Sequence, residues 1–144
     1  MIAIDTNVLL RYLLWDDAVQ AQKADKLING DDNVLVTDIV LVEAIWTLKG
    51  KKYQLDKAQI ISMVSVLFEE KNIHFENPQI MWQSLNDYRQ AKTIKVAGKN
   101  KHADFADALI INKAKFYASA NNKNLKGVYT FDKAALNLDG TKSP

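Results

Sequence analysis

The chain opens with Met1-Ile2-Ala3-Ile4-Asp5-Thr6-Asn7, and this stretch decides how the fold is interpreted. Its first four residues form an apolar run of the length of a short β-strand, and the next three all favour the N-cap position of a helix. Apolar side chains then recur at helical spacing, at Val8, Leu9, Tyr12 and Leu13. The sequence therefore predicts a strand that leads directly into a helix.

The same order recurs along the chain. Val34-Leu35-Val36 predicts a second strand, and Thr37 or Asp38 can cap a helix that Gly50 ends. Further helices are expected over residues 18–28, 57–68, 78–91 and 103–120 and from about 133, further strands over 72–75 and 128–130, and a loop over 92–101. Strands that alternate with helices indicate an α/β fold with a short, mainly parallel sheet between two helical layers.

Length and composition indicate one soluble domain. We expect a single domain over residues 1–138 of the 144, followed by a frayed tail over 139–144. The longest apolar stretch, residues 39–48, is interrupted by Glu43 and has about half the length that a bilayer requires, so no membrane span is expected. The N-terminus has no pattern of a secretory signal, which favours the cytoplasm. The absence of cysteine excludes disulfides and thiolate metal sites.

Acidic residues stand where a sheet of this kind binds ligands. Asp5 and Asp132 each follow a predicted strand, and ligands bind beyond the carboxyl ends of parallel strands. Glu43, Asp104 and Asp107 lie in or beside predicted helices. Carboxylates that gather within a few ångströms resist ionising together unless a hard cation neutralises them. The sequence therefore predicts a metal site with oxygen ligands.

Each acid also has a structural interpretation. Asp5 and Asp132 could only cap helices, and Asp104 could be an acid of a first helical turn. The helix around Glu43 is interpreted as buried, so Glu43 needs either a metal or a buried salt bridge. Asp107 lies deeper in its apolar helix than Asp104 and is the stronger candidate ligand.

Four motifs together resemble the PIN-domain nucleases, and more closely the VapC-type toxins of toxin–antitoxin pairs. The first motif is Ile4-Asp5-Thr6-Asn7-Val8-Leu9-Leu10-Arg11-Tyr12-Leu13, followed by Asp16, Asp17 and Gln20. The others are Leu41-Val42-Glu43-Ala44-Ile45-Trp46-Thr47-Leu48, Asp104-Phe105-Ala106-Asp107-Ala108-Leu109-Ile110 and Thr130-Phe131-Asp132-Lys133. Their order and spacing agree with the family, which is more specific than any one motif.

The resemblance implies an endoribonuclease with one or two Mg²⁺ or Mn²⁺ ions. The implied ligands are Asp5, Glu43 and Asp107, with Asp132 or Asp104. Carboxylates are natural ligands for Mg²⁺, whose bound water can supply a nucleophile. The resemblance also implies products with a 5′-phosphate and a 3′-hydroxyl, a cognate antitoxin protein as partner, and a homodimer.

Several other residues are candidates for the same site. Asn7 could orient a ligand or water, or cap a helix, and Thr130 could bind a carboxylate or simply occupy a strand position. Arg11 could reach phosphate, pair with an acid, or remain a solvated surface side chain. Lys99 and Lys101 belong to a lysine-rich segment that could attract RNA or could be a solvated loop.

Two other function classes fit part of the pattern. A Mg²⁺-dependent phosphoryl-transfer or receiver-like α/β domain also gathers acids at strand ends, although only Met1 to Ile4 precede Asp5 here. A catalytically silent PIN-fold binding module would keep the fold without its chemistry. Acids in all four motifs argue against the silent module.

Overall fold

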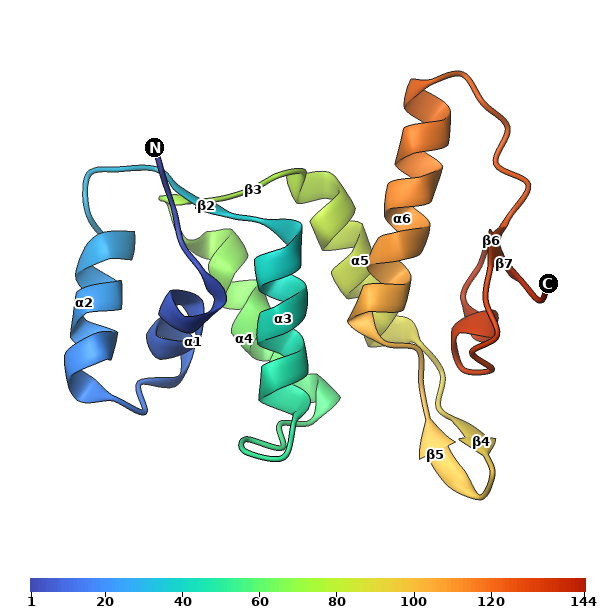
Figure 1. The fold of residues 1–144 in the computed structure, drawn as a ribbon, viewed down its shortest axis with the longest axis horizontal. Coiled ribbons are helices and arrows are strands. Elements are labelled where there is room, and N and C mark those ends of the chain that lie inside the picture. Colours follow the sequence, from blue (N-terminus) through green and yellow to red (C-terminus); the bar gives the residue numbers. More distant parts are fainter. The chain divides into compact units, whose positions relative to one another are not determined.

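The computed structural model describes all residues from 1 to 144. The chain forms two compact units, Met1–Pro78 and Gln79–Pro144. Figure 1 shows the elements of both units, with the first unit coloured blue to green and the second green to red. No helix is long and apolar enough to cross a membrane.

The first unit contains a parallel three-stranded sheet. Its strands are β1 (Ile2–Ala3), β2 (Val34–Val36) and β3 (Ile73–Phe75), in the order β1-β2-β3. Ile2 is in register with Val34, which is in register with Ile73. Because β2 has a neighbour on both sides, its Val34 and Val36 are fully buried. The predicted α/β class with a short, mainly parallel sheet is confirmed.

Four helices complete the first unit: α1 (Thr6–Leu14), α2 (Ala18–Ile28), α3 (Asp38–Lys49) and α4 (Lys57–Glu69). Asp5 caps α1, and Trp15 ends it in the left-handed region at a φ of 52°. Helix α4 begins with a capping box between Asp56 and Gln59, which satisfies two otherwise unpaired amides at once. Apolar side chains from these helices form the core, including Leu9, Ile28, Leu41, Ile45, Leu48, Ile60 and Leu67.

The second unit contains two long helices and short strands. The helices are α5 (Pro78–Gln90) and α6 (Phe105–Ala120), and a hairpin of β4 (Ile94–Val96) and β5 (Lys99–Lys101) connects them. Asn112 on α6 joins the two helices, because its side-chain amide donates to Asp87 Oδ2 on α5 (2.8 Å). After α6 come β6 (Val128–Tyr129), the 3₁₀ turn η1 (Ala135–Asn137) and β7 (Thr141–Lys142).

The lysine-rich segment expected as a loop is an antiparallel hairpin instead. Ala97 and Gly98 form its two-residue turn with φ angles of 51° and 77°. Positive φ at both turn positions matches the twist of a tight hairpin. The sequence gives a weak signal for this turn because alanine rarely adopts such a conformation.

The last residues also differ from expectation. Thr141 and Lys142, in the segment expected to be frayed, form β7 and pair in parallel with β6. Their position is stabilised by backbone hydrogen bonds from Val128 N to Gly140 O (2.8 Å) and from Thr130 N to Lys142 O (3.0 Å). A two-residue strand has no periodicity that a sequence could reveal.

Candidate metal centre

Asp5 and Glu43 both lie at the N-terminal end of α1 in the first unit. Asp5 caps α1, because its Oδ1 accepts a hydrogen bond from Val8 N (2.9 Å). The next residue, Thr6, donates from Oγ1 to Glu43 Oε2 on α3 (2.6 Å). The hydroxyl of Thr6 therefore holds the carboxylate of Glu43 at the N-terminus of α1, where Asp5 stands.

The interpretation of α3 as a wholly buried helix is wrong at Glu43. Glu43 is exposed, and Trp46, three residues later, is 53% exposed. Val40, Leu41, Ala44, Ile45 and Leu48 form the buried face. Because Trp46 is apolar, the sequence did not indicate that this face of α3 is exposed. Glu43 has no ion pair in the structure, so the hydroxyl of Thr6 is its partner, and the alternative of a buried salt bridge is also wrong.

Asp104 and Asp107 form a reciprocal capping box at the start of α6. Asp104 is the N-cap, and its Oδ1 accepts from Phe105 N (2.9 Å). Asp107 Oδ2 accepts from Asp104 N (2.8 Å). Both side chains are partly exposed, and the positive end of the helix dipole offsets part of the repulsion between them. The helix begins at Phe105, so Asp104 lies at the N-cap position and Asp107 at the third position of the helix.

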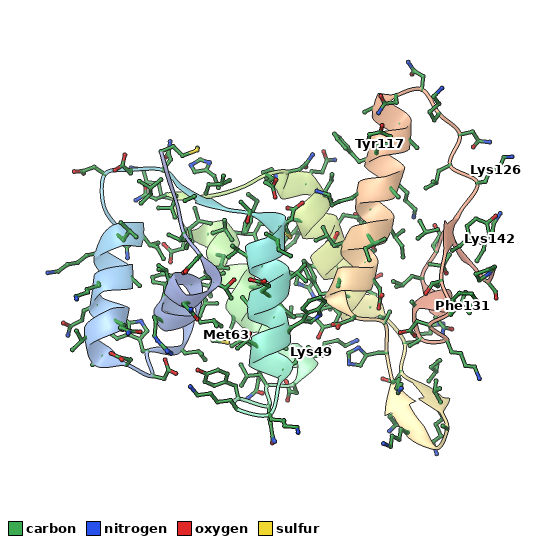
Figure 2. All side chains as sticks on the ribbon, in the orientation of Figure 1. Lys49, Met63, Tyr117, Lys126, Phe131 and Lys142 are labelled. Carbon is green, nitrogen blue, oxygen red and sulfur yellow. The ribbon has the colours of Figure 1, made fainter.

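Asp132 caps the turn that follows β6. Its Oδ1 accepts from Ala134 N (2.7 Å) and Ala135 N (3.2 Å). Thr130 Oγ1 accepts from the amide of Asp132 (3.0 Å), so this hydroxyl supports the backbone of Asp132. Phe131 between them is 86% exposed. Its side chain is labelled in Figure 2.

Asp107 and Thr130 line one small cavity of about 90 Å³ in the second unit. Ala135, whose amide is bound by Asp132, lines the same cavity. Asp107 therefore lies close to the turn after β6, which hydrogen bonds of Thr130 and Asp132 stabilise. Within this unit, two of the candidate residues, Asp107 and Thr130, line one recess, and Asp132 is hydrogen-bonded to a third lining residue, Ala135.

The remaining candidates of the first motif have different surroundings. Asn7 is exposed in the first turn of α1 and does not cap it, because Asp5 occupies that position. Arg11 donates to both oxygens of Asp16 (2.7 and 2.9 Å) and to Gln20 Oε1 (2.7 Å). Arg11 therefore stabilises the connection between α1 and α2 and is not a solvated side chain.

Tyr53 completes the network around Arg11. Its hydroxyl donates to Asp16 Oδ2 (2.8 Å). The hydrogen bond from Tyr53 lowers the pKa of the Asp16 carboxyl below its ordinary value, and Arg11 lowers it further, against the opposing effect of desolvation. The bond to Asp16 raises the pKa of Arg11. The sequence did not reveal the roles of Thr6 and Tyr53, because each bonds a residue 37 positions away.

The chain matches the PIN domain family over residues 2–140. It is a member of the PIN domain family. This membership confirms the predicted PIN-like three-layer α/β/α fold class and sets aside the receiver-like alternative. Among solved structures, this PIN domain is similar to VapC20 of Mycobacterium tuberculosis, described as a toxin that cleaves the sarcin-ricin loop. The two are 12% identical over 94% of this chain and 93% of VapC20, with a TM-score of 0.40. No curated protein sequence matches the chain.

The side chains of this PIN domain fit a hard divalent cation. The candidate donors are all carboxylates, which Mg²⁺ and Mn²⁺ prefer, and no thiol is present. Asp5 and Asp132 use one oxygen for a cap, and Glu43 uses one for Thr6. Neither unit by itself gathers three acidic or histidine side chains into a group that could hold an ion.

Proposed function

We propose that this PIN domain is a metal-dependent endoribonuclease and the toxin of a toxin–antitoxin pair. One observation carries the proposal. In a chain that matches the family over nearly its whole length, each motif acid stands at the N-terminal end of a helix or turn or is hydrogen-bonded to one. Carboxylates held at such ends have a second oxygen that can bind a hard cation, and the cation could in turn bind a phosphate.

The proposed ligands are Asp5, Glu43 and Asp107, with Asp132 or Asp104. A bound Mg²⁺ or Mn²⁺ would acidify the attacking water and neutralise charge on the phosphate. Thr6 orients Glu43 by holding one of its oxygens. The chain has no cysteine, and direct attack by water requires no covalent intermediate. Water would form the new bond to phosphorus as the bond to the 3′-oxygen breaks, which leaves a 5′-phosphate and a 3′-hydroxyl.

The VapC-like motifs support the finer part of the proposal. They favour a cytoplasmic protein that forms a homodimer, has an RNA substrate and is inhibited by a cognate antitoxin. The exposed acids would attract a basic segment of such an antitoxin. The exposed Asn7 on the first turn of α1 is proposed to position water or a ligand.

The test is an RNA cleavage assay on three proteins: the wild type, Asp107→Asn, and the control Asp31→Asn. Asp31 is an exposed acid in a turn and has no proposed role. Structured and unstructured RNAs are incubated with Mg²⁺, with Mn²⁺ and with a chelator. We expect cleavage by the wild type and the control that requires metal, and none by Asp107→Asn. Metal-independent cleavage, or equal activity of Asp107→Asn, would contradict the proposal, and absence of cleavage with intact RNA binding would favour the silent module.

A further inference from the structure

The segment from Lys92 to His102, here called the basic arm, concentrates positive charge. It contains four lysines and no acidic residue. The whole chain has a net charge of only +2, so the rest of the chain carries −2. The charge that could attract a polyanion is therefore local, although the composition of the chain as a whole is nearly neutral.

The hairpin in the basic arm gives these charges a defined geometry. Val96 is paired with Lys99 and Ile94 with Lys101, so both lysines lie on the face that carries the two apolar residues. Lys95, paired with Asn100, lies on the opposite face. Lys99 and Lys101 are two residues apart on one strand, which places their Cα atoms about 7 Å from each other. Successive phosphates of a nucleic acid strand have a comparable spacing.

The chain itself does not neutralise these lysines. Lys95, Lys99 and Lys101 are exposed, and none of them forms an ion pair in the structure. An isolated two-stranded hairpin is only marginally stable, and neighbouring like charges weaken it further. An anionic partner is the interaction that would offset this cost.

The base of the basic arm is fixed beside two of the proposed metal ligands. Lys101 is three residues before Asp104, so their Cα atoms are at most about 11 Å apart. Ala103 between them is buried, and the ring of His102 lies 5.8 Å from that of Tyr88. Asp104 then caps α6 and binds Asp107. An RNA strand bound along β5 would therefore pass close to Asp104 and Asp107.

We propose that the basic arm binds the phosphate backbone of the RNA substrate, with Lys99 and Lys101 on adjacent phosphates. This inference rests on the proposed ribonuclease function. The arm contains no Phe, Tyr or Trp on which bases could stack and no arginine that could read a base edge, and the ring of its one histidine, His102, lies beside that of Tyr88. It therefore supplies affinity and position without reading sequence.

The binding test uses the full chain with Asp107→Asn as background and a chelator present, so that no RNA is cleaved. A labelled single-stranded RNA is titrated at several salt concentrations into three proteins: the background variant, the same chain with Lys99→Ala and Lys101→Ala, and a control with Lys23→Ala and Lys26→Ala. Lys23 and Lys26 are exposed on α2 in the first unit, so the control loses the same charge elsewhere.

We expect the arm variant to bind about tenfold more weakly at moderate salt. Its plot of log K against log salt should be shallower by about 1.4, because each phosphate contact to a single strand contributes about 0.7. The control should match the background protein, and Lys99→Arg with Lys101→Arg should retain the affinity. Equal affinity and slope for arm variant and control would overturn the proposal. So would equally tight binding of poly-glutamate, which would indicate an acidic protein as the partner.

The outcomes separate this inference from the ribonuclease proposal. Loss of RNA binding in the arm variant, together with a wild-type chain that cleaves no RNA with Mg²⁺ or Mn²⁺, would support the arm and contradict the nuclease. Cleavage with metal by a protein whose arm variant keeps the wild-type KM would support the nuclease and overturn the arm. Circular dichroism of each variant checks that the chain remains folded.

Discussion

The two units use their candidate acids differently. In the first unit, Asp5 caps α1, and Glu43 on α3 accepts a hydrogen bond from Thr6, the residue after Asp5. In the second unit, Asp104 and Asp107 come from one helix start and bind each other's backbone in a capping box. Glu43 is not needed for any helix to begin, whereas Asp104 and Asp107 are. Asp5 in the first unit and the acids of the second unit therefore combine structure with proposed chemistry, whereas Glu43 can be changed with little effect on folding.

The largest expected effect comes from removing one charge in each unit. Glu43→Gln and Asp107→Asn should each lower the rate of metal-dependent RNA cleavage by roughly 100-fold or more. The amide oxygen can still accept the bond from Thr6 or from Asp104 N, so both variants should remain folded. Cleavage rates and circular dichroism measure the two properties, with Asp31→Asn as the control. Unfolding of either variant, or a wild-type rate, would contradict its role as a ligand.

A smaller effect is expected at Thr6, which positions Glu43. Thr6→Val keeps the shape of the side chain and removes its hydroxyl, so the cleavage rate should fall by about 10- to 100-fold. Thr6→Ser restores the hydroxyl and should recover most of the rate. The split between kcat and KM is the useful measurement, since orientation of a ligand should lower kcat. Equal rates for Thr6→Val and Thr6→Ser would show that this hydrogen bond has no function.

Stability measurements should distinguish the capping acid Asp104 from Glu43, which caps no helix. Asp104→Ala should lower the free energy of unfolding by about 1 kcal/mol, whereas Asp104→Asn should change it little because Asn is an equally good N-cap. Glu43→Ala, at an exposed position, should change it by less than about 0.5 kcal/mol. Urea denaturation of the three variants measures the difference. A larger loss for Glu43→Ala than for Asp104→Ala would reverse the comparison.

The smallest expected effect is the pH dependence of the first unit. The pKa of Asp16 is lowered by the hydrogen bond from Tyr53 and by Arg11, so its ionised form stabilises the folded state. This contribution is present above the ordinary value of 3.8 and is lost as the pH falls through the lower pKa of the folded state. The unfolding midpoint of Asp16→Asn should therefore be below that of the wild type at pH 7 and approach it in acid. A difference that does not change with pH would contradict this account.

Local signals predicted most of the fold. Asn29-Gly30 marks the end of the helix over residues 18–28, and the structure has the same bounds for α2. The strand over 34–36 is also confirmed without change. The β4–β5 hairpin was not predicted, because its turn requires a left-handed conformation at Ala97 and alanine is not a residue that indicates such a turn. Residue propensity and apolar spacing act over a few residues, so they could predict where helices and strands begin and end.

The candidate site was predictable only in part. The spacing of acids and strand ends indicated Asp5, Asp107 and Asp132, and the structure adds the cap that each one forms or joins. The exposure of Glu43 was not predictable, because Trp46 on the same face resembles a core residue. The bond between Thr6 and Glu43 spans 37 residues, and a single sequence contains no signal for such a contact.

The most direct test of the central claim is Mn²⁺ binding, measured by the loss of the free-ion signal in electron paramagnetic resonance. Wild type, Glu43→Gln, Asp107→Asn and the control Asp31→Asn are titrated without RNA. If acids of both units are metal ligands, Glu43→Gln and Asp107→Asn should each bind Mn²⁺ at least about tenfold more weakly than the wild type, and Asp31→Asn should bind normally. Wild-type affinity in either of the first two variants would contradict the claim that its acid is a ligand.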